Sequence, residues 1–154
     1  MNSIAPLRAA VQRPLRVPLP AEPAAAAQAR TLVTDAIRDW EIPVDPEVAG
    51  LLTSELVTNA IRHENGDMIR LFVTRSWGHL RVYVHDSCRK PPVPVDAPTD
   101  AEAGRGLMLV AGLSTDWGHY RTPAGKAVYF TLAFQTDSSD YAQRCNRSNH
   151  SYVR

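Results

Sequence analysis

"LLTSELVTNAIRHENG", residues 51–66, has the spacing of a buried helix, yet polar side chains interrupt its apolar positions. An α-helix advances about 100° per residue, so the apolar residues share one broad face, formed by Val48, Leu52, Leu56 and Ala60 with Leu51 at its flank. Glu55 and Asn59 lie one turn apart and project into the same arc, and His63 follows one turn later. The pattern predicts a helix over about 46–63 with a carboxylate and an amide on its inner side.

Two interpretations of Glu55 and Asn59 remain open from the residues alone. A carboxylate against apolar surface needs a partner, because burial of a bare charge costs several kcal/mol. The pair is either a buried polar cluster bonded to neighbouring backbone, or it lines a cavity that contains water and a cation. His63 leans to the same side, where a single histidine is more often structural than catalytic.

A second candidate site is the segment VYVHDS, residues 82–87. Successive side chains of a strand alternate between the two faces of a sheet. Val82, Val84 and Asp86 therefore share one face, with the acid at the end of an apolar row. Asp86 is either a turn residue at the end of a strand, or a carboxylate at the floor of a pocket that accepts hydrogen bonds from a ligand amine.

A third candidate site is GRGLMLV, residues 104–110, which reads as a helix opened by glycines. Glycine lets backbone N–H groups approach a phosphate, and the helix N-terminus adds favourable partial charge. A hinge after a loop explains Gly104 and Gly106 equally well. The segment follows no strand directly and no Gly-Lys-Ser/Thr occurs, so it is neither a P-loop nor a dinucleotide-binding motif.

The rest of the chain predicts an α/β (α+β) two-layer sandwich, in which a mixed β-sheet carries helices on one face. Pro46 after Asp45 suits the first turn and cap of the helix quoted above. The other expected elements are a strand over 13–20, a helix over 21–40, a hairpin of strands over 68–77 and 79–87, a proline-rich loop over 88–103, a helix from 104, and two strands over 115–122 and 126–134. We expect one domain over 13–135 between flexible tails, 1–12 and 136–154.

Composition and charge exclude some classes of protein. The 154 residues carry a net charge of +1, which gives no bulk attraction to nucleic acid or to an anionic membrane. Cys88 and Cys145 show no metal-like spacing, and we expect free thiols in a reducing compartment. No apolar stretch suits a membrane span or a signal peptide, so the chain is expected to be cytoplasmic.

In order and spacing, the candidate segments resemble the ATP-binding domain shared by DNA gyrase, the heat-shock chaperone ATPase, histidine kinases and mismatch-repair ATPases, the GHKL type. SELVTNAIRH resembles its asparagine box, VHDS its first glycine box and GRGLMLV its second glycine box. TDWG followed by GKAVYFTL resembles the closing strands of the small anti-sigma-factor serine/threonine kinases of Gram-positive bacteria. The resemblance covers about 13–134 and implies a Bergerat-type ATP-binding fold with ATP and Mg²⁺ as cofactors.

The resemblance also implies roles for individual residues. Asn59 would bind Mg²⁺, Glu55 would act as general base, and Asp86 would accept a hydrogen bond from the adenine amino group. The loop over 88–103 would be the ATP lid. Two further groups would contact the nucleotide phosphates, namely the backbone of Gly104, Arg105, Gly106 and Leu107, and the side chain of Lys126.

The first glycine box departs from the family's Asp-x-Gly pattern. Asp86 is followed by Ser87 and Cys88. The missing glycine bears on how closely the backbone approaches adenine.

The function implied is that of an ATP-dependent serine/threonine protein kinase that binds a sigma factor and phosphorylates an antagonist protein. The alternative is an ATP-binding partner-switching module without significant kinase activity. A histidine kinase fragment is less expected, because the sequence lacks a dimerisation helix with a phosphoacceptor histidine. We expect no direct nucleic-acid or membrane partner, and the resemblance allows a homodimer.

Overall fold

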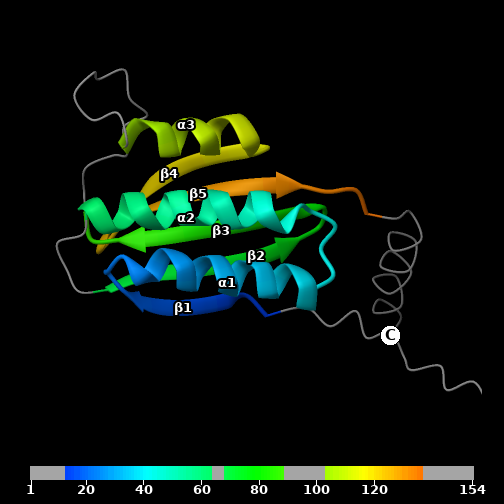
Figure 1. Ribbon diagram of the computed structural model, residues 1–154, viewed down its shortest axis with the longest axis horizontal. Helices are drawn as coiled ribbons and strands as arrows, with labels where there is room; N and C mark the ends of the chain where they lie inside the picture. The colour runs from blue at the N-terminus through cyan, green and yellow to red at the C-terminus, as the bar shows by residue number, and fades with distance from the viewer. Residues whose placement is uncertain (1–12, 64–67, 89–102, 137–154) are drawn as a thin grey trace, which may run out of the picture.

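The computed structural model describes residues 13–63, 68–88 and 103–136, together with the side chains of those residues except at 103–105. The expected tails and most of the expected lid lie outside these ranges. Along the chain the elements are β1 (Leu15–Pro20), α1 (Ala24–Asp39), α2 (Pro46–His63), β2 (Met68–Ser76), β3 (His79–Asp86), α3 (Ala103–Leu113), β4 (Asp116–Thr122) and β5 (Gly125–Ala133). Figure 1 shows the helices packed side by side on one face of the sheet, which confirms the two-layer α/β sandwich.

The sheet has the order β1-β2-β3-β5-β4, and every neighbouring pair in it is antiparallel. The expectation of a mixed sheet is therefore corrected. β4 runs in the same direction as β3, but β5 lies between them and pairs with both. The connection from β1 to β2 passes through two helices that run as an antiparallel pair, which returns the chain antiparallel to β1.

The predicted start of α2 is confirmed. The backbone N–H of Glu47 donates to Asp45 Oδ1 at 2.9 Å, and Pro46 occupies the first helical position. The carboxylate satisfies one of the N–H groups that a helix N-terminus leaves without an intrahelical partner, and proline lacks such a group. α2 therefore begins at a defined residue, which sets where its later turns lie along the sheet.

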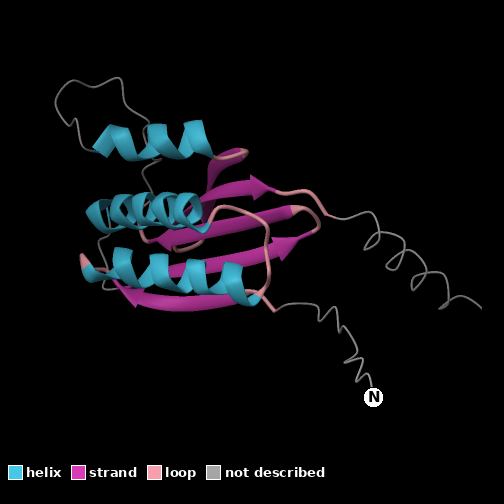
Figure 2. Ribbon diagram, turned by 45° about the vertical axis from the view of Figure 1, so that its right-hand side comes forward, coloured by secondary structure: helices cyan, strands magenta, loops and turns pink. Residues whose placement is uncertain are grey.

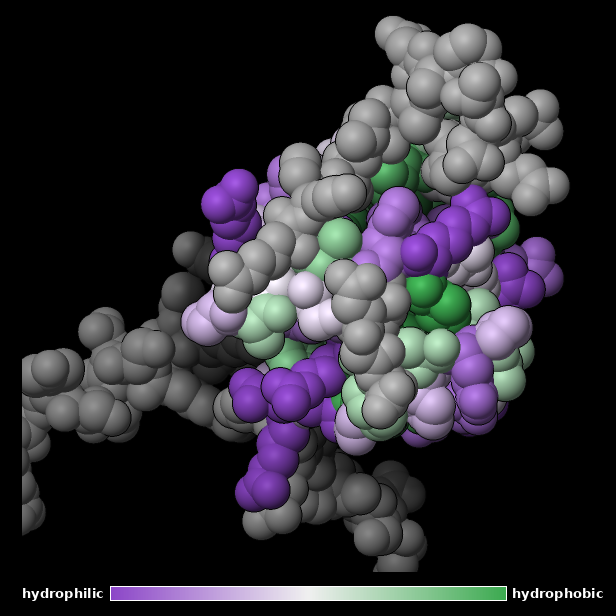
Figure 3. Space-filling model, turned by 90° about the vertical axis from the view of Figure 1, so that its left-hand side faces the viewer, coloured by the Kyte–Doolittle hydropathy of each residue, from purple (hydrophilic) through white to green (hydrophobic). Residues whose placement is uncertain are grey.

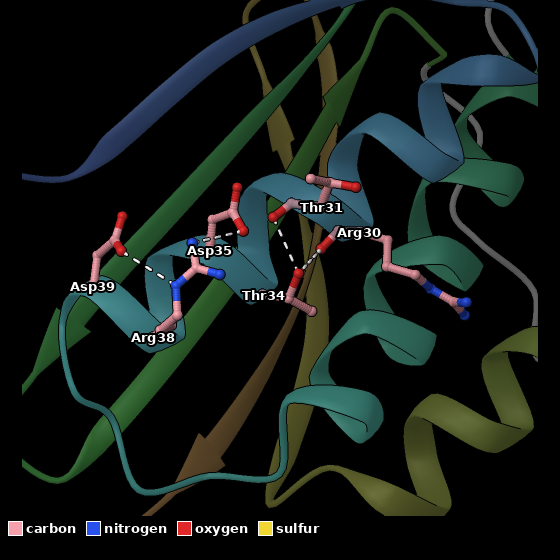
Figure 4. Close-up of polar contacts among 6 residues, drawn as sticks. All are labelled: Arg30, Thr31, Thr34, Asp35, Arg38 and Asp39. Atoms are coloured by element: carbon pink, nitrogen blue, oxygen red, sulfur yellow. Dashed lines mark hydrogen bonds and ion pairs between the residues drawn. The ribbon is translucent and has the colours of Figure 1, made fainter.

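α1 presents a polar outer side, which Figure 4 shows in detail. Arg38 lies 3.1 Å from Asp35 and 3.6 Å from Asp39, and all three side chains are exposed. Thr34 Oγ1 donates to the carbonyl of Arg30 at 3.0 Å. Exposed ion pairs contribute about 1 kcal/mol or less, so burial of the inner side of α1, and not these contacts, holds the helix in place.

The core lies between the helices and the inner face of the sheet. The inner face of the central strands consists of alternating buried residues, Leu80, Val82, Val84, Val128 and Phe130. α2 covers them with Leu52, Leu56, Val57 and Ala60, all of which belong to the same buried cluster. The predicted apolar face is thus confirmed at Leu52, Leu56 and Ala60, whereas Val48 is partly buried and Leu51 lines a groove beside α1.

The opposite face of the sheet carries no helix of the described chain, as Figure 2 shows. Aromatic side chains gather there, with ring centroids 4.5 Å apart for Phe72 and His85 and 5.7 Å apart for Tyr83 and Tyr129. Burial lowers the pKa of His85, and the charge of Arg70 lowers it further. The carboxylate of Asp86, which points to the other face, acts in the opposite direction and raises the pKa of His85.

Two further findings concern the sequence expectations. None of the helices in residues 13–63, 68–88 and 103–136 is long and apolar enough to span a membrane. Cys88 is buried and carries a free thiol, as expected, whereas Cys145 lies outside the described residues.

Replacement of Leu52 by alanine should destabilise the fold by about 2–5 kcal/mol, because the lost methyl groups leave a cavity in the core. Leu52 is fully buried, whereas Leu109 on α3 is 40% exposed. The same change at Leu109 should therefore cost about 0.5 kcal/mol or less. Urea denaturation of both variants measures the difference, and equal losses would contradict the placement of the core.

Candidate functional site

Four elements meet at one end of the sandwich. The second half of α2, the start of α3, the end of β3 and the start of β5 all lie toward the left-hand end of Figure 1. Figure 3 looks onto this end, where apolar residues lie between hydrophilic ones. The fold thus brings together the three candidate segments of the sequence, which lie in α2, at the end of β3 and at the start of α3.

Asn59 points inward from α2 and is only 8% exposed. Its Nδ2 is buried without a hydrogen-bond partner among the described residues. A buried polar group left unsatisfied costs about 1–3 kcal/mol, so this side chain is poised for a ligand. The unused group is an amide N–H donor, which can donate to an anionic oxygen such as that of a phosphate. A contact with Mg²⁺ would use the amide oxygen Oδ1 and stays a prediction.

The donor set around Asn59 suits Mg²⁺ and not a transition metal. Within the described ranges, no three His, Cys, Asp or Glu side chains are grouped so as to hold a metal ion. Mg²⁺ keeps most of its waters and takes few protein ligands, completing its shell with substrate phosphates. A single amide oxygen from Asn59 is compatible with this coordination. His63, one turn further, is exposed and joins no such group.

Glu55 lies against the first turn of α3. A side chain at Gly106 would collide with Glu55 Oε2, and an added Cβ would lie 3.3 Å from Glu55 Cδ. The first turn of a helix has unsatisfied N–H groups and partial positive charge, which favour a nearby carboxylate. The structure thus joins the first and third candidate sites. Because Glu55 Oε2 is the far end of a flexible side chain, a larger residue at position 106 would require Glu55 to move.

The remaining predicted residues of the third segment lie in or beside the same helix start. Gly104 and Arg105 belong to the first turn of α3. The side chain of Leu107 is 1% exposed and belongs to the core, so only its backbone is available to a ligand. The phosphate contacts expected of these backbones stay predictions.

Asp86 forms a buried ion pair with Lys126. Both carboxylate oxygens lie 3.0 Å from Nζ, and the side chains of Lys126 and Asp86 are 2% and 0% exposed. The two residues face each other across β3 and β5, so their side chains leave the sheet on the same side. The phosphate contact expected of Lys126 stays a prediction, because the partner that the structure shows for this ammonium group is the carboxylate.

Gly125 and Cys88 are site residues that the motifs did not reveal. An added Cβ at Gly125 would collide with the carbonyl oxygen of Asp86 and lie 2.6 Å from Cα of Ser87. Only glycine lets the two strands approach so closely here. Its position immediately before Lys126 is a signal in the sequence, but the register that sets it against Asp86 is not.

The departure from Asp-x-Gly places a residue with an ordinary backbone conformation at Cys88. The backbone N–H of Cys88 donates to Asp86 Oδ1 at 2.8 Å, and the cysteine side chain is buried. Among the described non-glycine residues only Glu41 has a positive φ. Cys88 therefore adopts a backbone conformation that needs no glycine, and its amide helps to orient the carboxylate.

Two grooves elsewhere on the described part of the molecule are separate from this site. One of about 500 Å³ lies between β1 and α1 and includes Leu19 and Leu32. The other, of about 510 Å³, lies between α1 and α2 and includes Arg30 and Gly50. Neither is lined by a predicted site residue.

Lys126→Met should lower the free energy of unfolding by about 3–5 kcal/mol, because it leaves the carboxylate of Asp86 buried without its counter-ion. The double variant Asp86→Leu with Lys126→Met should recover much of that loss. Arg38→Met removes a cation from an exposed pair and should cost about 1 kcal/mol or less. Urea denaturation compares the three, and similar effects of Lys126→Met and Arg38→Met would contradict the buried pair.

Comparisons with known proteins found similar solved structures and a matching family. Among the similar solved structures is the blue-light activated histidine kinase of Erythrobacter litoralis EL346, at 26% identity and a TM-score of 0.46, over 71% of this chain and 42% of that chain. Another is the histidine kinase domain from that protein, at 26% identity and a TM-score of 0.46, over 75% of this chain and 62% of that chain. This chain spans less than two thirds of the length of either. No curated protein matches it.

The family comparison covers most of the sequence. Residues 19–132 match the family described as the histidine kinase-like ATPase domain. This range runs from the end of β1 to the last residues of β5 and contains all the candidate site residues. The chain therefore belongs to the histidine kinase-like ATPase domain family.

Proposed function

We propose that this chain is an ATP-binding regulatory protein that transfers the γ-phosphoryl group to a serine or threonine of an antagonist protein, as an anti-sigma-factor kinase does. The observation that carries the proposal is the position of Glu55 against the start of α3, one helical turn before the buried amide of Asn59 on α2. Membership of the family supports ATP binding. The acceptor residue, the antagonist and a sigma factor as partner are inferred from the resemblance of the motifs.

Different residues of the site would bind the Mg²⁺ ion, the phosphates and the adenine base. Asn59 would hold Mg²⁺, and the first-turn N–H groups of α3 would hold phosphate oxygens. Asp86 would accept a hydrogen bond from the adenine amino group. Bound Mg²⁺ would supply neutralisation of the charge on the phosphates.

The residues that act on the acceptor are fewer. Phosphoryl transfer depends mainly on positioning and on charge stabilisation. Glu55, one turn before Asn59 on the same helix, would orient the acceptor hydroxyl and accept its proton. Its carboxylate lies against Gly106, in the first turn of α3 whose N–H groups we propose to bind phosphate. We infer that nucleotide binding moves this carboxylate away from the first turn of α3, since phosphate and carboxylate would repel each other there.

An ATP-binding module without kinase activity is the alternative function. The missing glycine of Asp-x-Gly is its support in the sequence, and the ordinary φ of Cys88 does not bear on how closely adenine approaches the backbone there. The two functions differ in whether Glu55 acts on an acceptor hydroxyl. Transfer of label from γ-labelled ATP to a second protein distinguishes them.

Asn59→Ala should abolish Mg²⁺-dependent binding of ATP, with at least about a tenfold loss in affinity, because a charge-assisted contact is removed. Titration calorimetry with ATP, with and without Mg²⁺, measures this loss. Stability should be nearly unchanged, because Nδ2 makes no hydrogen bond among the described residues. Ser54→Ala is the matched control, since Ser54 lies on the same helix but bonds to Arg30. Unchanged affinity in Asn59→Ala would refute the metal role.

Glu55→Gln should leave the affinity for Mg-ATP within about threefold but lower phosphoryl transfer by about 10²–10⁴-fold, the usual contribution of a general base. The assay is label transfer from γ-labelled ATP to the protein that co-purifies with this chain. Transfer by the parent and none by the variant supports the kinase. ATP binding by the parent without any transfer would favour the binding module.

A further inference from the structure

The ammonium group of Lys126 has more donors than its known partner uses. Nζ carries three N–H donors, and its hydrogen bond in the structure goes to Asp86 Oδ1. Even if the second carboxylate oxygen, also at 3.0 Å, takes another donor, one donor remains. Within residues 13–63, 68–88 and 103–136 no other acceptor is found for it, although the side chain is 2% exposed. A buried donor of a charged group needs an acceptor.

The location of this donor suggests the acceptor. Both oxygens of Asp86 lie 3.0 Å from Nζ, so any group that donates to the carboxylate also comes close to the ammonium group. A ligand that fits must therefore present a donor and, next to it, an acceptor. In adenine the 6-amino group is flanked by two ring nitrogens, N1 and N7, both of which accept hydrogen bonds.

We propose that Lys126 is a specificity-determining residue of the nucleotide site, which donates a hydrogen bond to the ring nitrogen beside the amino group that Asp86 accepts. The inference rests on the proposed function, because it assumes that Asp86 binds adenine. It assigns Lys126 to the base and not to the phosphates. Cys88 N–H and Lys126 together hold the carboxylate from the protein side.

A purely structural role explains these contacts less well. A buried ion pair is often no more stabilising than an apolar pair of the same volume. Leucine or valine at both positions would continue the apolar rows of Val82 and Val84 on β3 and of Val128 on β5. A carboxylate and an ammonium group at the end of these apolar rows can instead form hydrogen bonds with the polar edge of a base.

The test uses ATP analogues in which a single ring nitrogen is replaced by carbon. The parent protein is titrated in the calorimeter with Mg²⁺ and ATP, 1-deaza-ATP, 7-deaza-ATP or 3-deaza-ATP. Loss of the acceptor that Lys126 uses should weaken binding by about tenfold or more, so either the 1-deaza or the 7-deaza analogue should bind worse than ATP. N3 lies on the opposite side of the ring from the amino group, and 3-deaza-ATP is therefore the matched control that should bind like ATP.

The same titrations of the Lys126→Met variant complete a double-mutant cycle between this residue and the ring nitrogen. In a folded Lys126→Met protein the analogue that bound poorly to the parent should bind within about twofold of ATP, since the coupling between residue and ring nitrogen is gone. A thermal melt establishes that the variant is folded, and if it is not, the parent titrations decide alone. Equal affinities of the parent for ATP, 1-deaza-ATP and 7-deaza-ATP would overturn the role of Lys126. Failure of ATP itself to bind would instead overturn the proposed function.

Discussion

The contact between the end of β3 and the start of β5 sets the rest of the structure. Gly125 has no side chain, so its backbone packs directly against Asp86 and Ser87. The facing pair, Asp86 and Lys126, then closes into a buried ion pair. Because side chains alternate along a strand, this register decides which residues of β5 face the helices. A shift by one residue would move Val128 and Phe130 out of the core and separate the two charges.

α2 serves both the core and the site with residues of one helical face. Leu52 and Leu56 are buried against the sheet, and Asn59 follows on the same side toward the end where α3 begins. The apolar contacts fix the rotation of the helix, and this rotation in turn holds the amide of Asn59 inside. The site is thus positioned by packing rather than by a flexible loop, which favours a defined binding geometry.

Secondary structure was largely predictable, because local signals were strong. Asp45 with Pro46 marked the start of α2, and alternating apolar residues around Gly78 marked the β2–β3 hairpin. The expectation of a mixed sheet was wrong, since the sequence of β4 contains no signal that β5 would lie between it and β3. The departure at Cys88 seemed important from the motif, yet the backbone there needs no glycine.

The sequence by itself determined the elements, the apolar faces and the identity of the polar residues set among them, since helix and strand periodicities are local properties of the chain. It also pointed to Glu55, Asn59 and Asp86 one by one. Only the tertiary structure decided that Glu55 lies against Gly106 and that Lys126 is the partner of Asp86. Both contacts join residues at least 40 positions apart, and strand order and register, which depend on the packing of the whole core, bring them together.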